Sequence, residues 1–322
     1  MKIAIAQLNF HIGNFELNES KIIDSINKAK KANSDIIIFS ELAISGYPPR
    51  DFLEFEDFIE KCHKSIEVIA KECVEIAAVI GAPSINPNIK GKNLFNSAFF
   101  LAEGKIKSII NKTLLPTYDV FDEYRYFEPN SEFKVIEYFG KKLAITICED
   151  LWNISDDPMY TVNPMDELTK QNPDFIINIA ASPFHYKQRE ARIDILKKNI
   201  EKYQIPLFYS NHVGAQTELL FDGGSMAINT SGEIFEMNYF EEDFRVFDTE
   251  QFSTMYSGNN NETPIIERIH DALVMGIRNY FHKLGFNKAI LGLSGGIDSA
   301  VVLVLAERAL GKENVKALLL PS

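Results

Sequence analysis

The chain has 322 residues, of which 46% are hydrophobic, and its formal net charge is -12 at pH 7. A chain of this length and composition is typical of an ordinary globular protein with one large domain or two. The acidic balance argues against a nucleic-acid partner, because that function requires a concentrated basic face.

The amino-terminal segment opens with a strand, a helix and a second strand. Residues 2–9 alternate in hydrophobicity, residues 18–32 carry apolar side chains at helical spacing, and residues 35–41 form a buried strand. The first strand begins without the charged and apolar segments of a signal peptide. No apolar run reaches about 18 residues, so we expect a cytoplasmic protein with no membrane span.

Hairpins interrupt this alternation further along the chain. An amphipathic helix (residues 55–73) and a buried strand (76–81) continue the series, and residues 94–110 then form a predicted β-hairpin. A second hairpin (132–147) leads into a further buried strand. The loop between the hairpins (111–130) is long and rich in aromatic residues, which is typical of functional loops. Hairpins within such a series predict a mixed sheet.

The alternating order then returns. Strands predicted at 174–180 and 206–211 flank a helix at 187–203, and a last hairpin covers 225–237. Two sheets with hairpins and outer helices predict an α/β fold, arranged as a four-layer α-β-β-α sandwich over residues 1–250.

A polar segment rich in Gly, Asn and Pro, residues 251–264, is a predicted linker. A helix (265–284) and a strand (289–293) follow it, and a glycine-containing loop then starts another helix. Residues 265–322 therefore predict the beginning of a doubly wound α/β domain. About 60 residues are a third or so of what such a domain needs to cover its sheet, so we expect a truncated domain or fragment.

Cys148 is the candidate nucleophile. It stands at the carboxyl end of a buried strand, where open α/β sheets place their chemistry. The three cysteines lack CxxC spacing, which argues against structural disulfides and a zinc site. Glu41 and Lys112 follow two other predicted strands, so three strand ends can converge on one pocket.

The three side chains have complementary chemistry. A thiol with a pKa near ~8.5 needs, at neutral pH, a base or a stabilising cation, which Glu41 and Lys112 would supply. Lys112 could also face the oxyanion of a tetrahedral intermediate, together with the backbone N–H of Glu149. Three other interpretations stay open: Cys148 as a core cysteine, Glu41 as a solvated carboxylate or helix cap, and a Cys/His dyad with His185.

Three sequence blocks resemble the signature blocks of the nitrilase or carbon–nitrogen hydrolase superfamily in composition, order and spacing. They are Ser40-Glu41-Leu42 with Gly46-Tyr47-Pro48-Pro49, Lys112 to Pro116, and Ile147 to Trp152. The resemblance covers roughly residues 1–250 and implies an αββα fold. It also implies that Glu41 is the general base, Lys112 stabilises the intermediate and Cys148 is the nucleophile, with Glu123 helping to position the pocket.

A second resemblance concerns the loop after the strand at 289–293. The sequence Ser-Gly-Gly-Ile-Asp-Ser resembles the pyrophosphate loop of ATP pyrophosphatases, in which glycines and a helix N-terminus let backbone N–H groups approach phosphate. The predicted ATP-binding residues are Gly292, Leu293, Ser294, Gly295, Gly296, Ile297, Asp298 and Ser299. A nitrilase-like domain followed by this loop resembles the glutamine-dependent NAD synthetase family.

This second resemblance implies residues that contact glutamine. Tyr118 falls at the family's glutamine-contacting tyrosine, and Ser182 matches a serine that holds the amino-acid end of the substrate. Gln188 occupies a place where the family often has lysine, and Lys187 is adjacent, so either is a candidate. Arg192 falls in the family's arginine place. Structural alternatives are a packed aromatic for Tyr118, a turn residue for Ser182 and an ion-pair partner for Arg192.

The combined resemblance implies a homo-oligomeric enzyme that hydrolyses L-glutamine and passes the ammonia to an ATP- and Mg²⁺-dependent amidation of deamido-NAD. No metal site is expected within the chain itself. Two alternatives remain: another amidase of the same superfamily, or a non-catalytic nucleotide-binding or scaffold protein. Ammonia release from glutamine, compared with other amides, discriminates the first, and selective labelling of Cys148 by a glutamine-like electrophile discriminates the second.

Overall fold

The computed structural model describes residues 1–88, 90–155, 157–252 and 263–319. Residues 253–262, the centre of the predicted linker, lie outside this description. Within the described ranges, no helix combines the length and apolarity that crossing a bilayer requires.

The first sheet and its two crossover helices come from the first half of the chain and one late strand. They are β1 (Lys2–Gln7), α1 (Phe15–Lys31), β2 (Ile36–Ile38), α2 (Glu56–Glu72), β3 (Ala77–Ile85), β4 (Leu94–Ala102), β5 (Lys105–Asn111) and β14 (Asp243–Asp248). The strand order is β14-β1-β2-β3-β4-β5. β1, β2 and β3 run parallel, whereas β14, β4 and β5 pair antiparallel with their neighbours, so the predicted mixed sheet is confirmed.

The second sheet has a parallel centre and antiparallel edges. Its elements are β6 (Ile136–Tyr138), β7 (Lys141–Ile147), β8 (Phe175–Ala180), α4 (Gln188–Tyr203), β9 (Leu207–Asn211), β12 (Met226–Ile228) and β13 (Ile234–Glu236). The order is β13-β12-β9-β8-β7-β6, with β7, β8 and β9 parallel. Parallel strands place their carboxyl ends at one edge, which brings the residues after β7 and β8 together.

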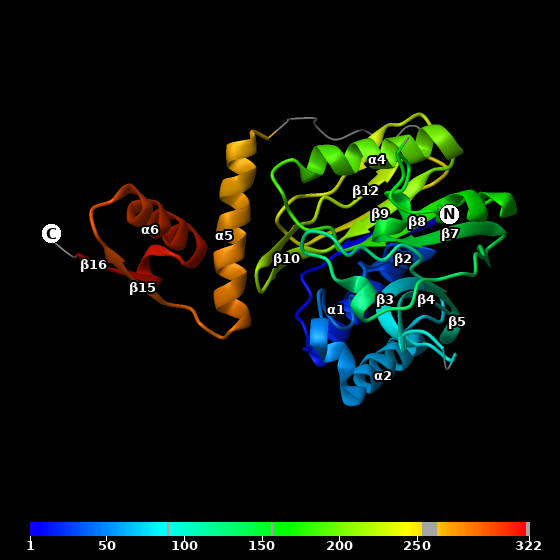
Figure 1. Ribbon diagram of the computed structural model, residues 1–322, viewed down its shortest axis with the longest axis horizontal. Coiled ribbons are helices and arrows are strands. Elements are labelled where there is room, and N and C mark those ends of the chain that lie inside the picture. Colours follow the sequence, from blue (N-terminus) through cyan, green and yellow to red (C-terminus); the bar gives the residue numbers. More distant parts are fainter. Residues whose placement is uncertain (89, 156, 253–262, 320–322) are drawn as a thin grey trace.

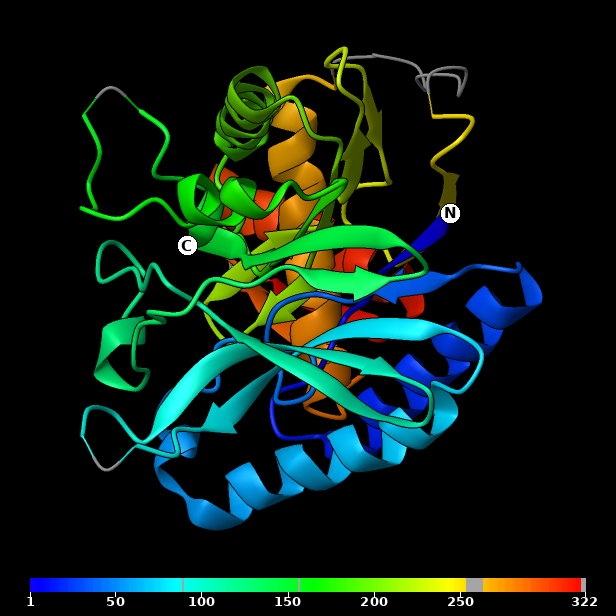
Figure 2. The same cartoon turned by 90° about the vertical axis from the view of Figure 1, so that its right-hand side faces the viewer.

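The two sheets pack face to face, with helices outside them. Ile3 and Ile5 of β1 share a core with Ile145 and Ile147 of β7 and Phe208 of β9. α1 and α2 cover the outer face of the first sheet and α4 covers the outer face of the second (Figures 1 and 2). Each large aliphatic side chain buried here stabilises the fold by about 1.5–3 kcal/mol.

α2 illustrates how the sequence pattern produces this packing. Ile59, Cys62, Ile66 and Ile69 recur every three or four residues and are buried, so they form the stripe that faces the first sheet. Short 3₁₀ helices, labelled η, and a short α-helix complete the described fold. They are η1 (Arg50–Glu54), η2 (Glu123–Arg125), η3 (Cys148–Leu151), α3 (Pro164–Leu168), η4 (Thr169–Gln171) and η5 (Lys312–Asn314).

The sequence did not predict the hairpin that lies between β9 and β12 in the chain. β10 (Val213–Gln216) and β11 (Leu219–Asp222) pair antiparallel as a separate two-stranded sheet. Thr217 and Glu218 form its turn, and Thr217 has a φ of 50°. This turn lacks the Asn-Gly or Asp-Gly signal by which two-residue hairpins are normally found.

The C-terminal elements are α5 (Ile265–Lys283), β15 (Ala289–Leu293), α6 (Ile297–Leu310) and β16 (Val315–Leu319). β15 and β16 are parallel and joined through α6, which gives the βαβ unit expected at the start of a doubly wound domain. α5 lies between this unit and the sandwich (Figure 1), and packs on both α6 and β10.

Candidate active site

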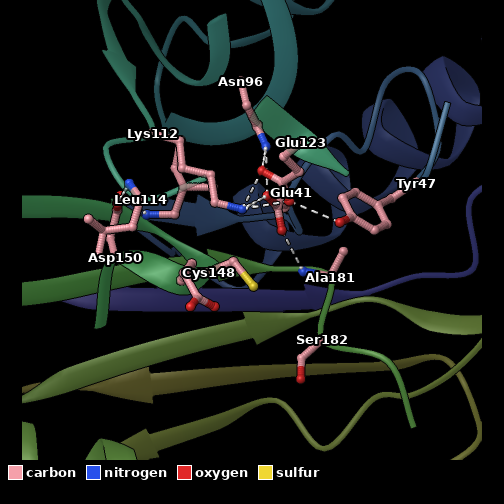
Figure 3. A network of polar contacts seen from close by, with 12 residues as sticks. Glu41, Tyr47, Asn96, Lys112, Leu114, Glu123, Cys148, Asp150, Ala181 and Ser182 are labelled. Carbon is pink, nitrogen blue, oxygen red and sulfur yellow. Dashed lines mark hydrogen bonds and ion pairs between the residues drawn. The ribbon is translucent and has the colours of Figure 1, made fainter. Parts of the chain in front are cut away.

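Glu41 lies on the loop after β2, and its side chain is fully buried. Its Oε1 accepts hydrogen bonds from Lys112 Nζ and from Asn96 Nδ2, each at 2.7 Å. Its Oε2 accepts one from the backbone N–H of Ala181 at 3.0 Å (Figure 3). Oε1 therefore holds two strong donors and Oε2 holds one, which leaves Oε2 the oxygen better able to take a proton.

Lys112 follows β5 directly, and its ammonium is buried between two carboxylates. Nζ lies 2.7 Å from Glu41 Oε1 and 2.7 Å from Glu123 Oε2, while Tyr47 donates its hydroxyl to Glu123 Oε1 at 2.9 Å. Burial lowers the pKa of Lys112, but attraction to Glu123 and Glu41 outweighs it, so the pKa lies well above its usual value. Burial raises the pKa of Glu123 against the opposing effect of Lys112.

Cys148 follows the last residue of β7 and begins η3 with a φ of 44°. That left-handed conformation is strained for a residue with a side chain, and such strain is common where a reactive group must be aimed. Figure 3 shows the sulfur directed toward the space beside Glu41, Lys112 and Ala181. Burial, reinforced by the charge of Glu41, raises the pKa of Cys148 well above its usual value, so the resting group is a thiol.

Asp150 joins the lysine segment to the cysteine turn. Its Oδ1 accepts from the backbone N–H of Thr113 at 3.0 Å and of Leu114 at 2.9 Å, and its Oδ2 accepts from the N–H of Ile147 at 3.0 Å. Asp150 is 3% exposed, so water does not replace these bonds. One carboxylate thus fixes the residue before Cys148 relative to the residues after Lys112.

A cavity of about 500 Å³ opens on Cys148. Its walls come from the aromatic-rich loop (residues 111–130), η3, the segment between β8 and the start of α4, and the β10–β11 hairpin. The lining includes Tyr118, Val120, Phe121, Cys148, Glu149, Trp152, Ser182, Phe184, His185, Gln188, Glu218, Leu219 and Leu220. A cavity of this size with a few convergent polar groups suits a small polar molecule.

The polar groups of this cavity are held in place. Glu149 Oε1 accepts from the hydroxyl of Tyr118 at 2.9 Å and from that of Tyr160 at 3.2 Å. Gln188 Nε2 donates to Ser182 Oγ at 3.2 Å. Tyr118, Ser182 and Gln188 thus lie in the same cavity as Cys148, and their contact with a substrate stays a prediction of the resemblance.

Two other predicted contact residues lie elsewhere. Lys187 is exposed and is not part of the cavity wall, which favours Gln188 of the two candidates. Arg192 is fully buried in α4, where it donates to Asp222 Oδ1 at 2.8 Å and to the carbonyl of Gly223 at 3.1 Å. This burial and pairing favour the structural alternative, in which Arg192 is an internal ion-pair partner.

His185 lines the cavity but is exposed, and its Nδ1 accepts from the backbone N–H of Lys187 at 3.4 Å. Glu41 is instead buried on the side toward which the Cys148 sulfur points. The geometry therefore favours a carboxylate base over a Cys/His dyad.

The predicted phosphate loop joins β15 to the N-terminus of α6. Gly295 has a φ of 83°, which favours glycine, and Gly296 is the N-cap of α6. Ser299 donates its hydroxyl to the carbonyl of Gly296 at 2.9 Å, and Ser294 Oγ lies 3.4 Å from Ser299 Oγ. A Cβ added at Gly295 would meet no atom within 4 Å, so the loop backbone is open to approach. Gly292 and Leu293 belong to the strand that carries this loop.

Sequence reasoning missed Asn96, Tyr160 and the role of Asp150. Asn96 lies in β4 between Phe95 and Ser97 and is fully buried, so a polar amide inside a largely apolar strand was the available signal. Asp150 stood within a recognised sequence block, but nothing in the sequence shows which backbone groups it accepts from. Tyr160 comes from a segment without periodicity, and only the folded chain brings it to Glu149.

Comparison with known proteins identifies two families along the chain. The carbon–nitrogen hydrolase model matches residues 2–246, and the NAD synthase model matches residues 269–322. The first match covers the sandwich with Glu41, Lys112 and Cys148, and the second covers α5 onward.

Full-length relatives combine both regions. The chain is 39% identical to a glutamine-dependent NAD⁺ synthetase from Synechocystis sp. over 99% of its length, and 34% identical to one from Thermotoga maritima over 100%. A solved glutamine-dependent NAD⁺ synthetase from Acinetobacter baumannii, in complex with ADP, is 35% identical and superposes with a TM-score of 0.89 over 99% of this chain and 59% of that one. The chain spans 59% and 60% of the two relatives' lengths.

A smaller neighbour matches the sandwich alone. An amidase from Nesterenkonia sp. superposes with a TM-score of 0.66 at 20% identity, covering 77% of this chain and 92% of that one. At this identity the likeness concerns the fold, and it confirms the nitrilase-like arrangement expected for the first 250 residues.

Proposed function

Because the chain belongs to the carbon–nitrogen hydrolase family, we propose that residues 1–250 hydrolyse the side-chain amide of L-glutamine. The ammonia then serves an ATP-dependent amidation of deamido-NAD to NAD, begun by residues 265–322 in a longer protein. The observation that carries the first half is one buried ammonium, Lys112, held between Glu41 and Glu123 next to a thiol on a strained turn.

The first step follows from the protonation states. Cys148 rests as a thiol, so its proton must leave as the sulfur attacks. Glu41 Oε2 receives this proton, and the new S–C bond forms at the glutamine side-chain carbonyl carbon. The oxygen of that carbonyl becomes an oxyanion, stabilised by the Lys112 ammonium and the backbone N–H of Glu149, an effect worth several kcal/mol in a dry site.

The second step reverses the roles. Glu41 returns the proton to the amide nitrogen, the C–N bond breaks and ammonia leaves a thioester on Cys148. Water then attacks the thioester carbon, with Glu41 taking its proton. The C–S bond of the tetrahedral intermediate breaks, Glu41 returns the proton to the sulfur, and glutamate leaves. Lys112 stays hydrogen-bonded to Glu41 and Glu123 during these transfers.

The cavity lining supports glutamine as the substrate. Glutamine carries an α-ammonium, and the Glu149 carboxylate with the hydroxyl of Tyr118 offers a negatively charged receptor for it. Tyr160 supports this receptor by its hydrogen bond to Glu149. Ser182 and Gln188 form a neutral polar pair on another wall and are placed to hold the α-carboxylate.

The synthetase half rests on the loop at Ser294–Ser299. Backbone N–H groups at the start of α6 would hold the pyrophosphate of ATP. Among the described residues, no group of three or more His, Cys, Asp or Glu side chains could hold a metal ion, so Mg²⁺ would come mainly on the ATP phosphates, with Asp298 as the nearby carboxylate. We place the boundary between the halves at residues 251–264, and propose a homo-oligomeric, cytoplasmic enzyme as in the resemblance.

Replacing Cys148 tests the amidase half. Cys148→Ala should reduce ammonia release from glutamine to background, whereas Cys73→Ala, at another buried thiol, should retain it. Amides without an α-ammonium should be poor substrates. Faster turnover of such amides than of glutamine would point to a different amidase, and retained glutamine hydrolysis in Cys148→Ala would refute the proposal.

The synthetase half needs the longer protein. With Cys148→Ala there, NAD formation from free ammonia and ATP should persist, while formation from glutamine is lost. Loss of both would contradict two separate sites.

A further inference from the structure

α5 supplies the hydrogen bonds that the outer edge of β10 lacks. Ala215 donates its backbone N–H to Asn279 Oδ1 at 3.0 Å, and its carbonyl accepts from Lys283 Nζ at 2.8 Å. Lys283 also donates to the carbonyl of Phe10 at 2.8 Å. Two side chains one turn apart on α5 thus take the place of a neighbouring strand.

The same helix touches the other strand of the hairpin at Gly276. A Cβ built on Gly276 would lie 2.9 Å from Leu220 Cδ2, so only a hydrogen atom fits between this helix turn and β11. Leu220 in turn lines the Cys148 cavity, together with Leu219 and Glu218 of the hairpin. Gly276 therefore stands directly behind one wall of the substrate cavity.

The hairpin is also tied to two neighbouring segments, one of which lines the cavity. The backbone carbonyl of Leu220 accepts from the N–H of Phe184 at 2.6 Å, which couples it to the wall that carries Ser182. Glu218, at the turn, forms an ion pair with Arg50. A shift of the hairpin would consequently move two walls of the cavity.

We propose that α5 is a positioning element of the amidase cavity, and that the contact of Gly276 with Leu220 sets how far the hairpin wall stands from Cys148. This assigns a role in glutamine binding to a helix that lies in the region matched by the NAD synthase model. The proposal rests on glutamine hydrolysis as the function of this cavity. Gly276 acts through Leu220 and touches no reacting atom.

The variant Gly276→Ala tests this role. Alanine is a better helix former than glycine, and the atom it would meet is the end of a flexible side chain, so the fold should be retained with an unchanged or higher Tm. Leu220 must move, however, and the cavity wall moves with it. We expect KM for glutamine to rise about 3- to 10-fold with little change in kcat, because Cys148, Glu41 and Lys112 keep their contacts.

A double-mutant cycle separates this effect from a general disturbance. In a Leu220→Ala background the added methyl group meets no side-chain end, so Gly276→Ala should then leave KM within about 2-fold of Leu220→Ala alone. Ile266→Ala, at an exposed position of the same helix, should leave KM unchanged. An equal effect of Gly276→Ala in both backgrounds, or no effect in either, would overturn the proposal.

A readout that does not require turnover distinguishes the proposed glutamine hydrolysis from the proposed role of α5. The rate at which a glutamine-like diazo ketone alkylates Cys148 should fall several-fold in Gly276→Ala and recover relative to Leu220→Ala in the double variant. If the unmodified protein released no ammonia from glutamine but showed this labelling pattern, the proposed function would fail and the role of α5 would stand. The absence of the pattern, with ammonia release intact, would remove the role of α5 alone.

Discussion

At the scale of single residues, Asn96 is a buried hydrogen-bond donor to the carboxylates of the site, and the sequence did not assign it a role. Its Nδ2 lies 2.7 Å from Glu41 Oε1 and 3.4 Å from Glu123 Oε2, so it contacts both carboxylates that flank Lys112. Its donation occupies Glu41 Oε1 together with Lys112, whereas Oε2 accepts from the backbone N–H of Ala181. A buried donor to a carboxylate contributes more than a neutral hydrogen bond does, because the acceptor is charged.

We expect Asn96→Ala to lower kcat for glutamine about 10- to 100-fold, the factor that corresponds to losing a charged hydrogen bond of about 1.5–3 kcal/mol. Steady-state measurement of ammonia release checks this. Ser97→Ala is the matched control, since Ser97 is the next residue of β4 and bonds Ser84 and Asn111 instead. An unaltered kcat in Asn96→Ala would show that Lys112 and the backbone N–H of Ala181 orient Glu41 without Asn96.

The three candidate catalytic residues could be selected from the sequence because each follows a predicted strand. Cys148, Glu41 and Lys112 come at or shortly after the ends of β7, β2 and β5, and strand ends are where functional side chains collect. Asn96 could not be assigned in this way, since it lies inside β4 and is connected to Glu41 only through the sheet. The sequence left two roles open for Arg192, a substrate contact and an ion-pair partner. The buried pair that it forms with Asp222 favours the second role.

At the scale of elements, Asp150 couples β7 and η3 to the segment that follows β5. Three backbone N–H groups from two separate segments share one carboxylate. This arrangement holds the strained conformation of Cys148 in register with Lys112, because a shift of either segment would break a bond that water cannot replace.

We expect Asp150→Asn to lower kcat at least about 10-fold and to lower Tm by about 5 °C. An amide has one acceptor oxygen, so either Ile147 or the pair Thr113 and Leu114 loses its acceptor, at a cost of about 1–3 kcal/mol. Steady-state kinetics and thermal unfolding measure the two effects, with the exposed Asp51→Asn as the control. A variant that kept both kcat and Tm would show that the two segments are held by packing alone.

The elements themselves were largely readable from the sequence. The buried strands at the centres of both sheets and the amphipathic helices α1 and α2 carry strong periodic patterns, and their bounds agree with the prediction within a few residues. The β10–β11 hairpin was missed because its turn, Thr217-Glu218, has ordinary residues in an uncommon conformation. Tertiary contacts with α5 and the cavity walls, which a sequence pattern does not record, hold it instead.

At the scale of the whole molecule, Lys283 forms part of the contact between α5 and the sandwich. Burial lowers the pKa of Lys283 to about 7, with Lys21 acting in the same direction and Glu242 opposing it. An unfolded lysine has a pKa near ~10.4. Between these two values the unfolded state binds more protons than the folded state, so the free energy of unfolding rises with pH.

We therefore expect the contribution of Lys283 to stability to increase from pH 7 to pH 10 and to be smallest below pH 7, where the buried ammonium is charged. The increase is at most about 1.4 kcal/mol per pH unit. Urea unfolding at pH 7, 8 and 9 should show a steeper rise for the unmodified protein than for Lys283→Met. Lys197→Met, at an exposed position of α4, should follow the unmodified protein. Parallel curves for all three proteins would contradict the shift.

The hydrogen bonds between Ala215 and α5 affect how a shortened version of this protein would behave. Without the helix, a strand end of the sandwich would present bare amide and carbonyl groups to solvent, and another molecule could add a strand there. A shortened amidase that ends before residue 263 would thus expose an edge of β10 that is prone to association. It would also lose the support of the hairpin that lines the Cys148 cavity. We expect a version that extends through Lys283 to keep this edge covered, because Asn279 and Lys283 then remain bonded to Ala215.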